Sequence, residues 1–290
     1  MSLRTPIVAL FTLLLATANS VQLSFAQQSD FARCLSDTLT RLEKNDYNTE
    51  RGLKDYDRAF LSALSPKLRA LVLKDGHWLD AGAGQARAIS EFVRLQQAKK
   101  EPVPRITALA YKADPDAARN YQSLSQKVGG QKLKLLQGRF LEQIPKSEIG
   151  ATDLITDVYG PFAYSQNLDQ VLNQYLELLK PGGSAMIAYD QAGTTFIRTR
   201  SGQSLNVLKW LKSLGRKDLL KVEHRSDHSG DDEHVIITRL GTDEIKVPRL
   251  KLVYLKDSAP PRRIFVEEGA QLNDKDRNLI IQGFEYKGFH

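Results

Sequence analysis

A glycine-spaced turn beside an acidic residue is the feature of this sequence best suited to hold a small-molecule ligand. Residues 78–86 read WLDAGAGQA, and Asp80 comes directly after an apolar stretch. Gly82 and Gly84 have no Cβ atom, so the backbone can turn tightly there and approach a ligand closely. Ala86 is small enough for the next helix to pack against the strand. This arrangement predicts a binding site for a nucleotide-like cofactor on a parallel sheet.

The dinucleotide-binding fingerprint of dehydrogenases is the nearest alternative for this turn. It requires a third glycine where this chain has Arg87, and an acid about 20 residues beyond the turn. Neither requirement is well met in this sequence. A dehydrogenase is therefore a distant alternative.

Three segments, met in order along the chain, instead resemble one enzyme family. The turn at residues 79–86 resembles motif I of the class I S-adenosylmethionine-dependent methyltransferases. Residues 152–160 (TDLITDVYG) resemble the fourth strand of that family. Residues 178–189 (LLKPGGSAMIAY) resemble its helix end, Pro-Gly-Gly turn and fifth strand. The resemblance covers roughly residues 70–240 and implies a methyltransferase with S-adenosylmethionine as its cofactor.

The elements that must position this turn follow a βαβ rhythm. Strands expected near residues 106, 133, 153 and 184 alternate with helical stretches, including one near Ser204, and residues 219–224 and 234–240 are expected to form an antiparallel pair. The resemblance implies an α/β fold of the Rossmann-like, doubly wound type. Its sheet would be mostly parallel and seven-stranded, with an antiparallel closing strand.

Extensions are expected at both ends of this domain. The predicted segments are a signal peptide (1–26), an N-terminal helical extension (27–74), the methyltransferase-like domain (75–241) and a small C-terminal β extension (242–290). The helical extension is inferred from apolar residues spaced as in amphipathic helices. Helices in this position commonly cover the cofactor or the substrate in the family.

Two positions depart from the family's usual pattern. After the second strand the family usually places an acid against the ribose, and the corresponding residues here are Ala110 and Tyr111. After the third strand it often has Gly-Asp near the adenine amine, whereas this chain has Gly138 and Arg139. Asp114 could reach the ribose, but its type and position favour a helix cap. The usual acidic anchors of the cofactor are thus absent.

Ligand chemistry in such a fold belongs at the carboxyl ends of the strands. The resemblance places the following residues at the cofactor: Asp80, Ala81, Gly82, Ala83, Gly84, Gln85, Tyr111, Gly138, Arg139, Phe140 and Asp157. Methyl transfer from a sulfonium mainly requires an acceptor held in line with the methyl group, and a base helps only when the acceptor must lose a proton. Candidates for orienting or deprotonating the acceptor are Asp157, Tyr159, Tyr164 and Asp190.

The methyl acceptor stays open among small molecules, lipids and protein side chains. Residues 157–160 (DVYG) differ from the acid or amide followed by two prolines and an aromatic that accompanies methylation of nucleobase amines. Cys34, the one cysteine of the chain, lies in the N-terminal extension, which disfavours a cysteine nucleophile. His224, His228 and His234 alternate with acids, but without a compact metal-ligand motif a solvated loop is favoured, and no metal is predicted.

The N-terminus predicts export. Arg4 precedes an apolar stretch at residues 6–18, and Ala26 ends a small-residue segment suited to signal-peptidase cleavage. The stretch is shorter than the roughly 20 residues of a transmembrane helix, so a periplasmic or secreted protein without a transmembrane segment is expected. The formal net charge is +7. The basic residues around Trp210 fit the solvated face of an amphipathic helix, so nucleic-acid binding is unsupported.

Two functional classes remain open. The first is an exported, active methyltransferase, which the glycine turn favours. The second is a non-catalytic exported binding or interaction module that keeps the fold, which the two missing acids and the export signal favour. The sequence leaves the oligomeric state undetermined.

Overall fold

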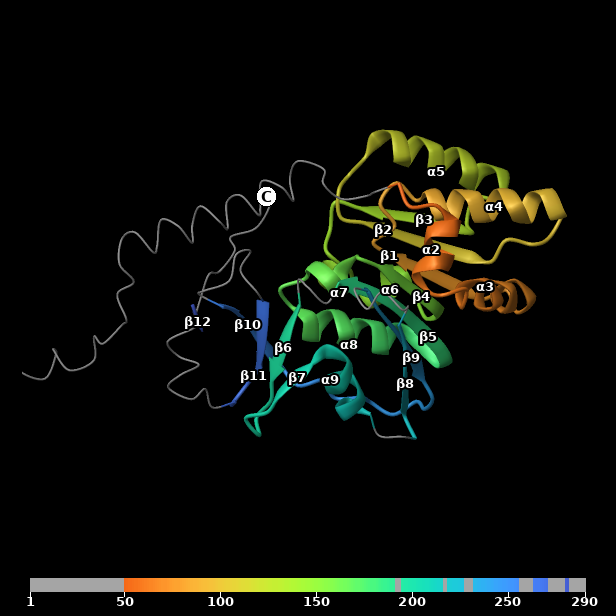
Figure 1. Ribbon diagram of the computed structural model, residues 1–290. Coiled ribbons are helices and arrows are strands. Elements are labelled where there is room, and N and C mark those ends of the chain that lie inside the picture. Colours follow the sequence, from red (N-terminus) through yellow and green to blue (C-terminus); the bar gives the residue numbers. More distant parts are fainter. Residues whose placement is uncertain are drawn as a thin grey trace, which may run out of the picture. The chain divides into compact units, whose positions relative to one another are not determined.

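Seven strands in the described part of the chain form one sheet (Figure 1). The computed structural model describes residues 50–190, 194–215, 218–226, 232–255, 263–270 and 280–281. In chain order the strands are β1 (His77–Ala81), β2 (Arg105–Ala110), β3 (Leu133–Gln137), β4 (Thr152–Val158), β5 (Leu179–Asp190), β8 (Leu220–Ser226) and β9 (Asp232–Arg239). Their order across the sheet is β3-β2-β1-β4-β5-β9-β8.

The direction of the strands confirms the predicted fold class. Strands β1 to β5 run parallel to one another, whereas β9 runs antiparallel to both β5 and β8. The sheet is therefore mostly parallel. At its edge lies the antiparallel pair that was predicted for residues 219–224 and 234–240. Because the chain adds strands in one direction from β1 to β3 and in the other from β4 onward, the switch point lies between β1 and β4.

Helices cover both faces of this sheet, as expected for a doubly wound fold. One face packs against α2 (Leu53–Ala59), α3 (Leu64–Leu73), α4 (Arg87–Lys99) and α5 (Pro115–Lys127). The other face packs against η1 (Leu141–Gln143), α6 (Lys146–Ile149), α7 (Pro161–Tyr164), α8 (Leu168–Leu178) and α9 (Val207–Leu214). Figure 1 shows α4 and α5 on one side of β1 to β3 and α8 on the other.

Alternation along each strand divides the core in two. Trp78 and Leu154 belong to the apolar cluster under α3 and α4, while the next residues, Leu79 and Ile155, belong to the cluster under α8. Successive side chains of a strand point to opposite faces of a sheet, so residues two apart share a cluster. This rule decides below where the acidic residues of β1 and β4 point.

The Pro-Gly-Gly turn expected ahead of the fifth strand is part of the strand itself. Strand β5 already begins at Leu179, directly after α8, and runs through the Pro-Gly-Gly segment. Thr152 pairs with Leu179 and Leu154 with Ser184, so β5 contains extra residues opposite β4 and its register shifts. Gly182, with φ of +79°, supplies the left-handed residue that this irregularity requires.

A second sheet links the C-terminal segment to the main domain. It has the order β12-β10-β11-β6-β7 and consists of β6 (Thr194–Arg198), β7 (Ser204–Asn206), β10 (Leu250–Leu255), β11 (Arg263–Glu267) and β12 (Ile280–Ile281). Strand β11 pairs in parallel with β6, which directly follows β5. The strands of the predicted C-terminal extension thus share a sheet with a segment of the predicted methyltransferase-like domain.

The region near Ser204 begins as a strand, with its helix just beyond. Strand β7 occupies residues 204–206, and Asn206 then caps α9 by accepting a hydrogen bond from the Lys209 N–H at 2.8 Å. The buried Trp210 of α9 donates from Nε1 to Glu267 Oε1 of β11 at 3.0 Å. This bond ties the second sheet to the domain core.

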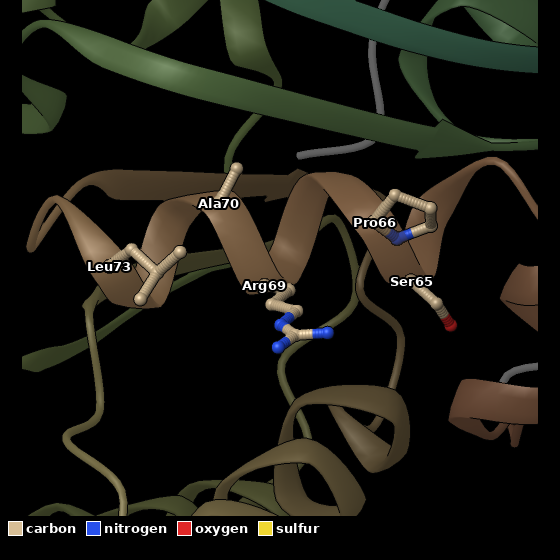
Figure 2. A pocket seen from close by; sticks show the side chains of 5 residues that line it. All are labelled: Ser65, Pro66, Arg69, Ala70 and Leu73. Atoms are coloured by element: carbon tan, nitrogen blue, oxygen red, sulfur yellow. The ribbon is translucent and has the colours of Figure 1, made fainter.

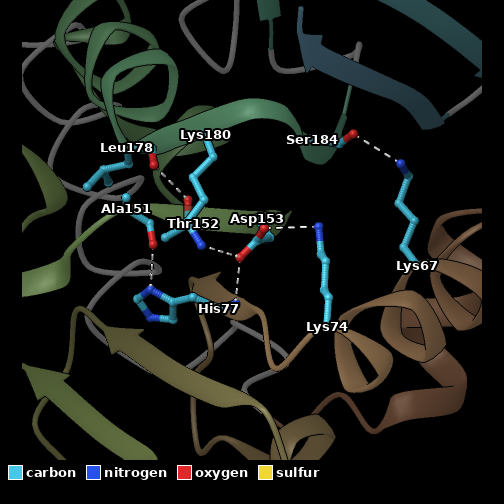
Figure 3. Close-up of polar contacts among 9 residues, drawn as sticks. All are labelled: Lys67, Lys74, His77, Ala151, Thr152, Asp153, Leu178, Lys180 and Ser184. Atoms are coloured by element: carbon cyan, nitrogen blue, oxygen red, sulfur yellow. Dashed lines mark hydrogen bonds and ion pairs between the residues drawn. The ribbon is translucent and has the colours of Figure 1, made fainter. Parts of the chain in front are cut away.

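An ionic cluster stabilises the amino edge of the main sheet, where the parallel strands begin (Figure 3). The Asp153 carboxylate accepts from Lys74 at 2.9 Å, from Lys180 at 2.8 Å and from the His77 backbone N–H at 2.9 Å. Burial alone would raise the pKa of Asp153, but the bonds from Lys180 and Lys74 lower it to about 2. His77 contacts Ala151 O and Thr107 Oγ1 through its ring. This edge is opposite to the one where a ligand is expected.

Several predictions concern residues outside the described ranges. These are the signal peptide, the helical extension up to residue 49, Cys34 and His228. Helices α2 and α3 belong to the remainder of that extension. Within the described ranges, none of the helices combines the length and apolar composition needed to cross a membrane.

Candidate functional site

The predicted glycine turn lies at the carboxyl end of β1, at the switch point of the sheet. Gly82 and Gly84 have φ values of +96° and +52°, and Ala86 has a φ of +55° just before α4 begins. The Gly82 and Ala83 N–H groups donate to Leu109 O of β2 at 2.9 and 2.8 Å. The turn is therefore tight, as its glycines predicted, with left-handed backbone at both of them, and it is held against the neighbouring strand.

The Asp80 carboxylate points into the fold instead of toward the open edge. Its side chain is 0% exposed, accepts from Tyr56 Oη at 3.1 Å and from Thr156 Oγ1 at 2.8 Å. Thr156 Oγ1 in turn accepts from Trp78 Nε1 at 2.8 Å. Burial raises the pKa of Asp80 to about 7, against the lowering effect of these bonds. Asp80 thus anchors α2 to β1 and β4 beneath the turn.

Asp157 is also enclosed, on the other face of the sheet. It is 0% exposed and accepts from the N–H groups of Gly160 at 2.6 Å and Phe162 at 2.8 Å, and from Tyr175 Oη of α8 at 2.6 Å. Burial raises the pKa of Asp157 to about 6 although these bonds act to lower it. In this structure its carboxylate shapes the turn after β4, whereas the sequence predicted contact with cofactor or acceptor.

The turns after β1 and β4 are in direct backbone contact. A Cβ atom on Gly160 would lie 2.5 Å from Ala81 O and 3.0 Å from Gly82 Cα. Gly160 has a φ of −101°, which any residue can adopt. Its missing side chain is therefore required by the close approach of the two turns and not by its own backbone conformation.

Replacing Gly160 with Ala is expected to force these turns apart. We expect a loss of about 3 kcal/mol in the free energy of unfolding, at the upper end for an overpacked site, because the added Cβ would meet backbone atoms of the facing turn and the hydrogen-bonded Asp157 carboxylate. Urea denaturation measures this loss. Gly215→Ala is the matched control, since its Cβ would come no nearer than 3.4 Å to any neighbour. Equal stability losses in both variants would contradict the close contact.

A stacked aromatic pair occupies the ends of β2 and β3. The rings of Tyr111 and Phe140 lie 4.5 Å apart at an interplanar angle of 24°, and the residues are 44% and 38% exposed. Gly138, with a φ of +71°, turns the chain between β3 and Phe140. Both rings are partly exposed, so this part of the edge offers ring surfaces to a ligand.

The polar residues near this pair are engaged with protein groups. Arg139 forms a two-bonded ion pair with Glu148 of α6, at 3.0 and 2.6 Å. Asp114 caps α5 by accepting from the Asp116 and Ala117 N–H groups, as its sequence position favoured. Gln85 donates to the other carboxylate oxygen of Asp114 at 3.3 Å. Gln85 thereby connects the glycine turn with the loop after β2.

Tyr159 and Tyr164 lie beyond the end of β4, as predicted. Tyr159 has a φ of +53°, which is unusual for a residue with a bulky side chain, and its N–H donates to Ala188 O at 2.9 Å. Tyr164 ends α7 and is 47% exposed. The Asp190 backbone ends β5 at the same edge of the sheet.

The sequence did not predict three residues at this edge. Arg51 and Tyr56 come from the segment that leads into and forms α2, and Tyr175 comes from α8. Each contacts a strand end more than 15 residues away along the chain. A signal for the enclosed acids did exist, because Asp80 is two residues after the buried Trp78 and Asp157 is two after Ile155.

A hollow of the described surface lies away from these residues. It has a volume of about 440 Å³ and is lined entirely by α3 (Figure 2). Its lining residues are Ser65, Pro66, Arg69, Ala70 and Leu73. None of them belongs to the predicted site. Among the described residues no group of three potential metal ligands comes together.

Comparisons with known proteins give weak likenesses. No family model matches the chain, and no curated protein does. Solved structures that match include a candidate rRNA methylase from Clostridium thermocellum (13% identity; 62% of this chain and 97% of that chain; TM-score 0.42). EvdMO1 matches at 14% identity, over 62% of this chain and 41% of its own, with a TM-score of 0.42. A candidate class I S-adenosylmethionine-dependent methyltransferase from Listeria monocytogenes matches at 13% identity, over 78% and 72%, with a TM-score of 0.42. The fold assignment rests on the chain's own strand order and not on these likenesses.

Proposed function

We propose that this protein is an S-adenosylmethionine-dependent methyltransferase whose cofactor binds at the carboxyl edge of the main sheet. The observation that carries the proposal is the left-handed glycine turn at the switch point of a sheet ordered β3-β2-β1-β4-β5-β9-β8. A dinucleotide-binding sheet continues with a parallel sixth strand. Here the antiparallel β9 stands in that place, which favours a methyltransferase over a dehydrogenase.

The edge contains groups that suit an adenosyl cofactor. The glycine turn allows close backbone approach, and the half-exposed rings of Tyr111 and Phe140 offer stacking surfaces for an adenine. When bound, the cofactor would supply an activated methyl group. The chain would then contribute position and exclusion of water. Tyr159 and Tyr164 flank the acceptor side, while the enclosed Asp80 and Asp157 hold the two turns in place.

A second candidate is a binding module that has lost catalysis. Asp80 of β1 and Asp157 of β4 are enclosed, Arg139 is paired with Glu148, and the Gly82 and Gly160 backbones touch. These contacts favour a site that requires rearrangement before it can hold a cofactor.

Stacking at Tyr111 provides the test of the cofactor site. Calorimetric titration with S-adenosylhomocysteine is expected to give micromolar binding, about 8 kcal/mol. Tyr111→Ala should lose about 1–3 kcal/mol of this, as is typical for a base stacked on an aromatic ring. Tyr111→Phe should retain most of it. Phe196→Ala removes a ring of similar exposure from β6 and serves as the control. Equal binding by Tyr111→Ala and wild type would contradict this placement of the adenine.

We further propose that the protein is exported. The basic residue, apolar stretch and small-residue site at the N-terminus support this proposal. N-terminal sequencing of protein from its native host should begin near Gln27. Soluble cytosolic protein that still begins with Met1 would contradict export.

A further inference from the structure

The segment that leads into α2 crosses the first turn of α4 and approaches the candidate site. Glu50 O accepts from Arg87 Nη1 at 3.4 Å, and the Leu53 N–H donates to Glu91 Oε2 at 2.8 Å. Further along, Tyr56 reaches Asp80 beneath the glycine turn. These bonds tie the segment to α4 and β1 on either side of Arg51.

The guanidinium of Arg51 lies at the end of β4. Its Nη1 donates to Val158 O at 3.3 Å, and its Cζ lies 4.9 Å from the centre of the Tyr159 ring. Tyr159 is held in its left-handed conformation by the bond to Ala188 O. Strained backbone of this kind tends to occur at ligand sites. The Tyr159 ring thus contacts the guanidinium from a backbone position that is itself held in place.

Among the described residues, most of the hydrogen-bonding capacity of Arg51 is unused. A guanidinium has five N–H donors in a planar fork that matches a carboxylate, and one hydrogen bond to a protein group is present here. Within the described part of the chain no carboxylate pairs with Arg51. The nearby Asp80 and Asp157 are enclosed and bonded to other groups. A cation beside a candidate ligand site, without an acidic partner, calls for an anionic group on the ligand.

We propose that Arg51 binds the carboxylate of a ligand at this edge. That carboxylate has two sources, the amino-acid end of S-adenosylmethionine or the methyl acceptor. The first source rests on the proposed function, since it requires the cofactor to bind. In either case Arg51 is a ligand-binding residue supplied by a segment outside the resemblance to the family.

The test compares ligands with and without a carboxylate. S-adenosylhomocysteine carries the amino-acid end, and 5′-methylthioadenosine lacks it. Phenylacetate and the uncharged phenylacetamide serve as acceptor-side probes, measured by NMR titration with and without S-adenosylhomocysteine. The variants are Arg51→Gln and Arg51→Lys. Arg58→Gln is the control, because it removes the same charge from the same segment at a side chain that is 82% exposed.

If the cofactor supplies the carboxylate, Arg51→Gln should weaken S-adenosylhomocysteine binding about ten- to a hundredfold, as for a charged hydrogen-bonded pair. Methylthioadenosine binding should then change less than about twofold on the same scale. Arg51→Lys should fall between, because it keeps the charge and loses the fork. If the acceptor supplies it, the loss should appear for phenylacetate alone.

Two results would overturn the proposal. One is an equal loss for S-adenosylhomocysteine and methylthioadenosine, which would assign Arg51 a structural role. The other is that Arg51→Gln weakens the binding of neither S-adenosylhomocysteine nor phenylacetate more than that of its counterpart without the carboxylate. Wild-type protein that binds neither adenosyl compound would instead overturn the proposed function. The phenylacetate titration without cofactor would still decide the role of Arg51.

Discussion

Raising the pH from about 4 to 8 is expected to lower the free energy of unfolding, with Asp80 as a main cause. Burial raises the pKa of this carboxyl from 3.8 to about 7. Between these values the folded protein holds a proton that the unfolded chain releases, so stability falls as pH rises through that window. At 1.36 kcal/mol for each pKa unit, the full change is roughly 4 kcal/mol. Above pH 7 the curve should level off.

Asp80→Asn isolates this contribution. The amide stays neutral at every pH in the window, and the hydroxyls of Tyr56 and Thr156 can each serve as donor or acceptor. Urea denaturation across the range should give a shallower pH dependence for the variant than for wild type. Burial lowers the pKa of His77, so this group makes stability rise with pH and opposes Asp80. Its effect is the same in both proteins and cancels when one curve is subtracted from the other. Parallel curves for the two proteins would show that Asp80 is not protonated inside the fold.

Asp157→Ala is expected to lower the free energy of unfolding by about 3–5 kcal/mol. The change leaves three buried donors without their acceptor, namely the N–H groups of Gly160 and Phe162 and the hydroxyl of Tyr175. Each unsatisfied buried donor costs about 1–3 kcal/mol. Urea denaturation measures the total. Faster hydrogen exchange at the Gly160 and Phe162 amides would locate the loss at the turn after β4.

Two milder variants serve as controls for this effect. Asp157→Asn keeps one acceptor oxygen and should lose less, and Tyr175→Phe removes one donor together with its bond, at about 1 kcal/mol. A loss below 1 kcal/mol for Asp157→Ala would contradict the anchoring role. In that case the carboxylate would be available to a ligand, as the sequence analysis predicted.

Local signals account for the parts of the fold that could be predicted. Gly82 and Gly84 marked the turn because left-handed backbone strongly favours glycine. Asp114 beside Pro115 marked the start of α5 because both residues suit the first turn of a helix. The mostly parallel sheet with its antiparallel closing strand followed from the resemblance and from alternating strand and helix patterns. The turn and the helix start are set by residues close together in sequence.

The enclosed network beneath the turns depends on packing between distant segments. Tyr56 meets Asp80 only because α2 lies on the face of the sheet that Trp78 and Asp80 share. Tyr175 meets Asp157 because α8 covers the opposite face. Period-two alternation could have predicted the face of each acid. It could not have predicted which hydroxyl would meet it, because that depends on where each helix packs. For the same reason Arg51 has no signal in the sequence.

Mapping by NMR can decide whether S-adenosylmethionine binds at the carboxyl edge of the main sheet. The backbone amides of the ¹⁵N-labelled protein would be followed during titration with S-adenosylhomocysteine. Saturable shifts concentrated at Gly82, Gly84, Tyr111, Gly138 and Tyr159 are the predicted result. The absence of saturable shifts, or shifts confined to α3 and the amino edge around Asp153, would contradict binding at the carboxyl edge and favour the binding module.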